Sequence, residues 1–119
     1  MNIRVLGLNH KTAPIEIREK VSFPSARIDQ ALLSLKSRQA VKENLILSTC
    51  NRTELYAVVE DGAAGSGQLV SFLADFHGLD PGQLSKYIYE KSDKDAVSHL
   101  FEVVSSLDSM IVGETQIFG

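Results

Sequence analysis

The chain has little of three things that would fix its class at once: cysteine, excess positive charge and long apolar runs. Its single cysteine, Cys50, excludes an internal disulfide, so a reducing compartment fits best. Its net charge of -3 is not that of a module that holds nucleic acid by its own charge. No apolar run approaches the roughly 20 residues of a bilayer-spanning helix, and no signal-peptide pattern opens the chain. We therefore expect a soluble cytoplasmic domain with no membrane partner.

The pattern of apolar residues predicts a small mixed domain. The 119 residues, 44% of them hydrophobic, are enough for one domain with a core. Alternating or continuous apolar runs predict strands at residues 2–9, 45–47, 55–59 and 87–89. Helical spacing of apolar residues predicts helices through residues 28–35, 69–76 and 97–107. The order β-α-β-β-α-β followed by an extra helix predicts an α+β, ferredoxin-like sandwich.

Several short signals refine these elements. Ser25 is a candidate N-cap of the first long helix, and Gly78 stands where a C-terminal cap is expected after the second. Residues 61–67 are glycine-rich and predict a loop. Their spacing, G-x-x-G-x-G, reverses the dinucleotide fingerprint, and the strand before them is expected to be antiparallel to its neighbour. No nucleotide site is therefore predicted there.

The segment with the most chemical content is Ser-Thr-Cys-Asn-Arg-Thr-Glu at residues 48–54, at the end of an apolar strand. A nearby cation favours the thiolate, so Cys50 beside Arg52 is a candidate nucleophile, although a lone cysteine is more often a small buried hydrophobe. Arg52 could also present its fork to a substrate carboxylate, or be a solvated loop arginine. Glu54 is either the partner of Arg52 or an ordinary exposed strand acid.

The three histidines and the polar C-terminal stretch supply the remaining candidates. His99 flanks the apolar face of the third helix and is the best acid-base candidate, its alternative being a half-buried helix-edge residue. His10 is a second candidate, whereas His77 is interpreted as structural because a cation suits a helix C-terminus. One cysteine and three scattered histidines lack the spacing of a metal site. Residues 108–109 and 113–116 form either a helix end and turn or a second wall of an active site.

Taken in order, these motifs resemble the N-terminal catalytic domain of the glutamyl-tRNA reductase family, over essentially the whole chain. The matching segments are Asn-His-Lys-Thr-Ala-Pro at 9–14, Arg18-Glu19, the block at 48–54, Ser98-His99-Leu100, Leu107-Asp108-Ser109 and Gly-Glu-Thr-Gln-Ile at 113–117. The resemblance implies that Cys50 attacks the ester of glutamyl-tRNA to form a thioester, which NADPH reduces to glutamate-1-semialdehyde. This is the first step of tetrapyrrole (haem) synthesis by the C5 route.

The resemblance also implies roles for particular residues. His99 corresponds to the histidine that supports activity in the family, and Arg52 is suited to the side-chain carboxylate of the substrate. The implied substrate-binding residues are Thr49, Asn51, Arg52, Ser109, Glu114, Thr115 and Gln116.

The family enzyme is longer than this chain. Residues 1–119 are expected to form a single catalytic, glutamyl-tRNA-binding domain that lacks the NADPH-binding and dimerisation domains. The full-length enzyme is expected to be a homodimer and this chain a monomer. We expect no cofactor-binding residues in the chain and no metal, and only the acyl-transfer or esterase half of the reaction.

Two rival interpretations stay open at this point. A cysteine hydrolase or acyltransferase would use Cys50 and a histidine without a redox partner. A non-catalytic module that binds tRNA or a regulator would have an inert, buried Cys50.

Overall fold

A computed structural model of the chain describes residues 2–60, 64–105 and 111–114, the last four and residues 64–66 through their backbone only. The strands of the described part are β1 (Ile3–Asn9), β2 (Val41–Ser48), β3 (Arg52–Val59), β4 (Tyr89–Ser92) and β5 (Ile111–Glu114). The helices are α1 (Ile15–Lys20), a 3-10 turn (Ser25–Arg27), α2 (Ile28–Lys36), α3 (Ala64–His77), α4 (Pro81–Leu84) and α5 (Asp93–Ser105).

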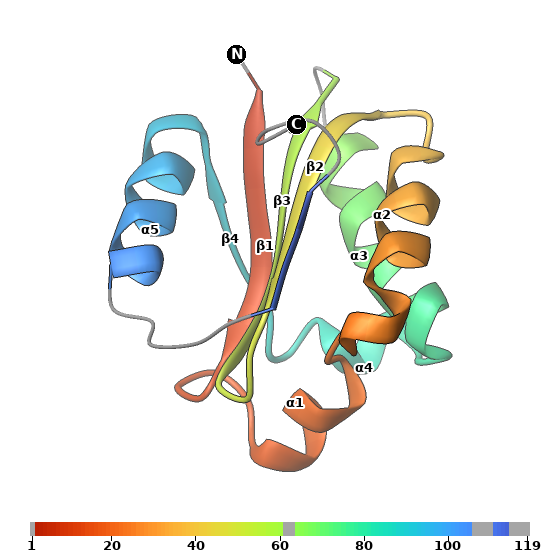
Figure 1. Cartoon of the computed structure of the whole chain (residues 1–119), viewed down its shortest axis with the longest axis vertical. Helices are drawn as coiled ribbons and strands as arrows, with labels where there is room; N and C mark the ends of the chain where they lie inside the picture. The colour runs from red at the N-terminus through yellow and green to blue at the C-terminus, as the bar shows by residue number, and fades with distance from the viewer. Residues whose placement is uncertain (1, 61–63, 106–110, 115–119) are drawn as a thin grey trace.

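The described strands form one antiparallel sheet in the order β4-β1-β3-β2-β5. The first four have the order and pairing of a ferredoxin-like sandwich, with α2 and α3 as the two helices on one face. Figure 1 shows α5, the predicted extra helix, on the opposite side of the sheet. The predicted fold class is confirmed.

One large apolar core lies between the sheet and the helices of the first face. Strand residues such as Leu6, Leu8 and Leu55 meet Leu35 of α2 and Phe72 of α3, all of them fully buried. Phe23 stacks on Phe72 with ring centroids 6.2 Å apart. On the α5 face a smaller cluster joins Ala96 and Val103 to residues of β1, β2 and β3. The two faces alternate along each strand, as the pleat requires.

Element boundaries differ from the prediction at several places. Strand β4 begins at Tyr89 rather than at residue 87, and α3 begins at Ala64, so residues 64–67 of the predicted loop are helical, while residues 61–63 lie outside the described part. Ser25 is not an N-cap, because a 3-10 turn begins there and α2 follows from Ile28 without a side-chain cap. Gly78 does end α3 in the left-handed conformation, with φ +67°.

Strand β5 was not predicted, and its last two residues belong to the segment 113–116 that was expected to be a turn or the wall of a site. Its backbone pairs antiparallel with β2, from Ser48 opposite Ile111 to Leu45 opposite Glu114. The segment has two β-branched residues but is short, and the unpaired edge of β2 supplies the partner that decides its conformation. Strand pairing of this kind depends on tertiary context.

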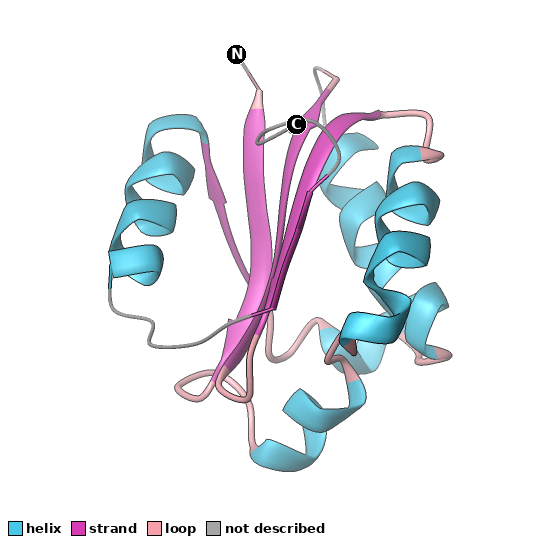
Figure 2. Cartoon of the chain, viewed as in Figure 1, coloured by secondary structure: helices cyan, strands magenta, loops and turns pink. Residues whose placement is uncertain are grey.

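The loops β1–α1 and β2–β3 gather with α1 at one end of the sheet (Figure 2). This end holds the segment that the sequence singled out, and α1 lies directly against it through a hydrogen bond from Arg18 to the Cys50 carbonyl.

Candidate active site

Cys50 lies at the tip of the hairpin that joins β2 to β3. The backbone N–H of Thr49 donates to the Arg52 carbonyl at 2.8 Å, and the Thr49 hydroxyl accepts from the N–H groups of Asn51 and Arg52. At the base of the hairpin, buried Ser48 accepts a hydrogen bond from the N–H of Phe23. Cys50 itself is exposed. The alternative of a small buried hydrophobe is therefore wrong, and the thiol is open to a ligand.

Arg18 ties this hairpin to the loop before α1. Its guanidinium donates from Nη1 to the carbonyl of Cys50 at 2.8 Å and from Nε to the carbonyl of Ala13 at 3.2 Å. Within that loop the side-chain oxygen of Asn9 accepts from the N–H groups of Lys11 and Thr12. Sequence reasoning included Arg18 in a motif but did not foresee that it would hold the hairpin.

Glu54 is the centre of a polar cluster on the α5 face. Its carboxylate is fully buried and accepts from Arg52 Nη1 at 3.4 Å and from the Tyr56 hydroxyl at 2.8 Å. The Tyr89 hydroxyl of β4 also donates to Glu54, and His99 Nε2 of α5 lies 2.5 Å from the same oxygen, Oε2. Of the two sequence interpretations of Glu54, pairing with Arg52 is confirmed and the exposed strand acid is wrong.

Two tyrosines of this cluster were missed by sequence reasoning. Tyr56 is two residues after Glu54 and therefore faces the same side of β3, which is a signal that strand alternation could have given. Tyr89 comes from the distant strand β4 and left no such signal. Burial first, and the Glu54 charge second, raise the pKa of both phenols, so that Tyr56 and Tyr89 stay protonated and act as donors to Glu54.

Gly7 of β1 leaves the space that Glu54 occupies. The two residues are opposite each other in the β1–β3 pairing. A Cβ atom at position 7 would lie 2.7 Å from the Thr53 carbonyl oxygen and 2.8 Å from Glu54 Cγ. Neither neighbour is the free end of a flexible side chain, so the cluster depends on glycine at this position.

Only part of the Arg52 guanidinium is hydrogen-bonded in the described part of the chain. Nη1 is held by Glu54, whereas Nε is buried and has no hydrogen-bond partner among the described residues. A guanidinium N–H that has no partner is suited to an anionic ligand group. The arginine is therefore not the solvated loop residue that was its alternative interpretation, since its side chain is only 14% exposed.

The structure brings together only part of the predicted site. Arg52 and His99 meet at Glu54, and in the described part of the chain the imidazole contacts Glu54 and Tyr89 rather than Cys50. His10 is exposed in the β1–α1 loop. Glu114 lies in β5, where only its backbone is described, and Ser109, Thr115 and Gln116 lie outside the described residues.

His77 is a structural residue, but for a reason other than the one predicted. Its ring packs against Phe23, with centroids 4.7 Å apart, and lies next to Phe76. Burial, helped by the Arg27 charge, lowers the pKa of His77 to about 4. The side chain is therefore neutral near pH 7 and is not the cation that a helix C-terminus would favour.

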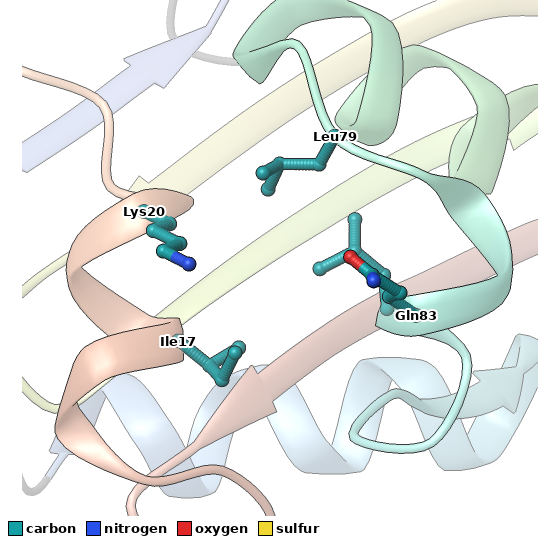
Figure 3. A pocket seen from close by; sticks show the side chains of 5 residues that line it. Ile17, Lys20, Leu79 and Gln83 are labelled. Carbon is teal, nitrogen blue, oxygen red and sulfur yellow. The ribbon is translucent and has the colours of Figure 1, made fainter.

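The pocket in Figure 3 is not a second substrate site. Side chains of α1 and α4, together with Leu79 from the link between α3 and α4, line it, and none of them belongs to the hairpin or the Glu54 cluster. Its volume of about 30 Å³ leaves room for only a few water molecules. It is too small for an organic substrate.

The described residues form neither a metal site nor a dinucleotide-binding site. No group of three or more His, Cys, Asp or Glu side chains is arranged around a possible metal position there. The sheet has only antiparallel pairs, and residues 64–67 of the glycine-rich segment are helical rather than a phosphate-binding turn after a parallel strand. These residues do not fit a nicotinamide dinucleotide. Along the same ranges, no helix has the length and apolar character needed to cross a bilayer.

Comparisons with known proteins agree with the motifs. Residues 6–119 match the family model described as "Glutamyl-tRNAGlu reductase, N-terminal domain". The chain is 50% and 48% identical to glutamyl-tRNA reductases of Syntrophotalea carbinolica and Pelobacter propionicus, over its full length and 27% of theirs. It also resembles the solved glutamyl-tRNA reductase of Methanopyrus kandleri, with a TM-score of 0.57 and 28% identity over 90% of this chain and 23% of that one. The chain therefore belongs to the glutamyl-tRNA reductase family and represents its N-terminal domain.

Proposed function

We propose that the chain is the acyl-capturing domain of a glutamyl-tRNA reductase, an enzyme of the first step of C5-route tetrapyrrole synthesis. The Cys50 thiolate attacks the ester carbonyl of glutamyl-tRNA, the new C–S bond forms a thioester, and the ester C–O bond breaks to release the tRNA hydroxyl. The observation that carries the proposal is the only thiol of the chain, which is exposed at the tip of a hydrogen-bonded hairpin that continues into partly buried Arg52.

Arg52 is the proposed recognition residue for the glutamate side chain. Glu54 holds one end of the guanidinium, and the unpaired Nε–H is left for a substrate carboxylate. A neutral glutamine side chain would leave this donor without its anionic partner, which is a basis for rejecting glutaminyl-tRNA. Thr49 and Asn51 shape the same turn. The proposed substrate pocket is completed by Ser109, Glu114, Thr115 and Gln116.

His99 is the proposed acid-base residue of the acyl step. Its contact with buried Glu54 fixes the imidazole on the same face of the sheet as Arg52. A histidine held in this way is oriented for proton transfer, which is the usual use of a histidine paired with a carboxylate.

Reduction of the thioester needs a hydride donor, NADPH in the full-length enzyme, and the described residues do not fit that cofactor. The chain spans 27% of the length of the curated relatives it matches. Within the proposal, the dinucleotide-binding and dimerisation domains lie in the rest of the protein, and the part played by residues 1–119 ends at the thioester. The full-length enzyme is then a homodimer and the isolated chain a monomer.

The test is a single-turnover reaction of the chain with glutamyl-tRNA in the absence of NADPH. We expect a glutamyl adduct on Cys50 by intact-mass spectrometry, tRNA deacylation at the same rate, and neither with Cys50→Ser. A matched control, Cys50→Ser combined with Gln30→Cys, moves the single thiol to an exposed position on α2. The proposal fails if the wild-type chain forms no adduct, or if the relocated thiol reacts equally well.

A cysteine hydrolase is the second function that an exposed Cys50 allows, and the same reaction separates it from the first. An acyl-capturing domain holds the adduct long enough for mass spectrometry and turns over slowly, whereas a hydrolase releases free glutamate through many cycles. Addition of NADPH is expected to give no semialdehyde from this chain alone. The non-catalytic module required a buried Cys50 and is not supported, because the residue is exposed.

A further inference from the structure

The hydrogen bonds around the Glu54 carboxylate indicate whether the His99 nitrogen that faces it, Nε2, carries a proton. Oε2 of Glu54 accepts hydrogen bonds from the Tyr89 hydroxyl and Arg52 Nη1 and is in contact with His99 Nε2. Oε1 accepts a hydrogen bond from the Tyr56 hydroxyl. Each of the other three partners is a donor, because a guanidinium has only donors and both phenols remain protonated. A carboxylate that pairs with arginine is an acceptor, so the hydrogen of the 2.5 Å contact belongs to Nε2.

We infer that Glu54, supported by Tyr89, is a positioning residue that fixes His99 as its Nε2–H tautomer and leaves Nδ1 as the nitrogen that accepts protons. A neutral imidazole has one N–H and one lone pair, so a hydrogen bond that fixes the first also fixes the second. Any proton that His99 takes from the Cys50 thiol or returns to the departing tRNA oxygen then passes through Nδ1. This catalytic consequence rests on the proposed function, whereas the tautomer does not.

Tyr89 contributes to this arrangement in two ways. Its hydroxyl shares Oε2 with His99, and its ring meets the imidazole edge-on, with centroids 5.5 Å apart and an interplanar angle of 63°. Strands β3 and β4 thus act together on a single side chain of α5. Tyr56 binds the same carboxylate through the other oxygen and has no recorded ring contact with His99 within the described part of the chain.

The charged and titratable groups around His99 come from three elements. From β3 they are Arg52, Glu54 and Tyr56, from β4 Tyr89, and from α5 itself Asp95 and Glu102, four residues before and three after the histidine. Asp95 and Glu102 are exposed, whereas the Glu54 carboxylate is fully buried and in direct contact with the ring. The buried carboxylate is therefore the group that selects the tautomer.

The first arm of the test is nitrogen-15 NMR of the histidines in the 119-residue chain, which needs no substrate. We expect His99 to carry its proton on Nε2 alone in the neutral form, with a downfield Nε2–H proton that exchanges slowly with water. Exposed His10 is the internal reference for an imidazole with free choice of tautomer. An Nδ1–H form of His99, or a mixture like that of His10, overturns the inference.

The second arm compares Glu54→Gln, Tyr89→Phe and Tyr56→Phe. A glutamine amide can donate to Nε2, so Glu54→Gln is expected to populate the Nδ1–H form and to slow thioester formation by about 100-fold, the lower end of an acid-base contribution. Because Glu54→Gln also disturbs Arg52, the two phenylalanine variants are the cleaner pair: each keeps its ring and removes one hydroxyl from Glu54. Tyr89→Phe is expected to speed exchange of the Nε2–H proton and to lower the rate of acylation, and Tyr56→Phe to do so less.

These outcomes separate the inference from the proposed function. If the His99 signature is present but Cys50 is never acylated, the tautomer stands and the acyl-transfer proposal fails. If Cys50 is acylated while Tyr89→Phe and Tyr56→Phe leave the exchange of Nε2–H unchanged, or change it equally, Tyr89 has no positioning role. The inference is also contradicted if the loss of thermal stability in Tyr89→Phe fully accounts for its lower acylation rate.

Discussion

The two faces of the sheet are built for different purposes. The face covered by α2 and α3 carries a large apolar core that includes Phe23 and Phe72, both fully buried. The face covered by α5 has a small apolar cluster, a cavity of about 110 Å³ between helix and sheet, and the buried carboxylate of Glu54. One face thus supplies most of the hydrophobic stabilisation, and the other holds polar groups that an apolar core would exclude.

The comparison shows how a small domain can hold a buried charge. Glu54 on the α5 face is surrounded by four donors, so its desolvation is offset locally. Strand β3, which carries two of these donors, is also fixed from the other face, where alternate residues of β1 and β3 such as Leu6 and Leu55 enter the large core. The position of Arg52 on β3 is therefore set in part by packing that its own side chain does not touch.

The largest expected effect is a difference in stability between matched substitutions on the two faces. Leu73→Ala on α3 removes a fully buried side chain from the large core and should cost about 3–5 kcal/mol of unfolding free energy. Leu100→Ala on α5 removes one that is only partly buried beside a cavity and should cost about 1–2 kcal/mol. Urea unfolding monitored by circular dichroism measures both. Equal costs would mean that the faces do not divide the work in this way.

The second prediction concerns the point where the backbone of β1 meets the polar cluster. Gly7→Ala places a Cβ atom against the Thr53 carbonyl and Glu54 Cγ and should cost about 1–3 kcal/mol. It should also displace the Glu54 carboxylate, so the rate of Cys50 acylation should fall by more than the loss of stability alone would cause. Gly82→Ala in α4 is the control, because its added Cβ meets only Asp80 side-chain atoms at 3.6 Å and beyond. A Gly7→Ala variant with normal acylation kinetics would contradict the link between the glycine and the site.

Much of this architecture could be predicted from sequence because it follows from local periodicity. Alternating and helical apolar patterns predicted the four ferredoxin-like strands and their helices, and the short link at residues 50–53 predicted adjacent antiparallel strands. What escaped prediction depends on distant partners. Strand β5 exists through the edge of β2, and Tyr89 reaches Glu54 across 35 positions of sequence.

The site could be predicted only in part, for the same physical reason. A short motif can mark Cys50 and Arg52, but the environment of Glu54 is created by β1, β4 and α5 together. An acidic residue in a strand is usually exposed, so sequence alone left its burial undecided. His77 is a similar case, because its position at a helix end suggested a cation while the aromatic cluster around it decided the opposite.

The smallest expected effect, on pH dependence, extends the comparison to the titratable groups of the two faces. His77 belongs to the apolar face, and burial there, with help from the charge of Arg27, lowers its pKa from 6.5 to about 4. Between these two values the unfolded chain binds a proton at this residue and the folded chain does not. The contribution of His77 to stability is therefore complete above pH 6.5, falls as the pH drops toward 4, and changes no further below that value.

Because the ring is only partly buried, this linkage should amount to ~1–2 kcal/mol between pH 7 and pH 4. His77→Phe keeps an aromatic ring against Phe23 and Phe76 and removes the titration. Its unfolding free energy should depend less steeply on pH across this window than that of the wild type. Parallel curves for His77→Phe and the wild type would mean that the apolar face tolerates a protonated His77, and that the separation of charge between the two faces is weaker than the packing implies.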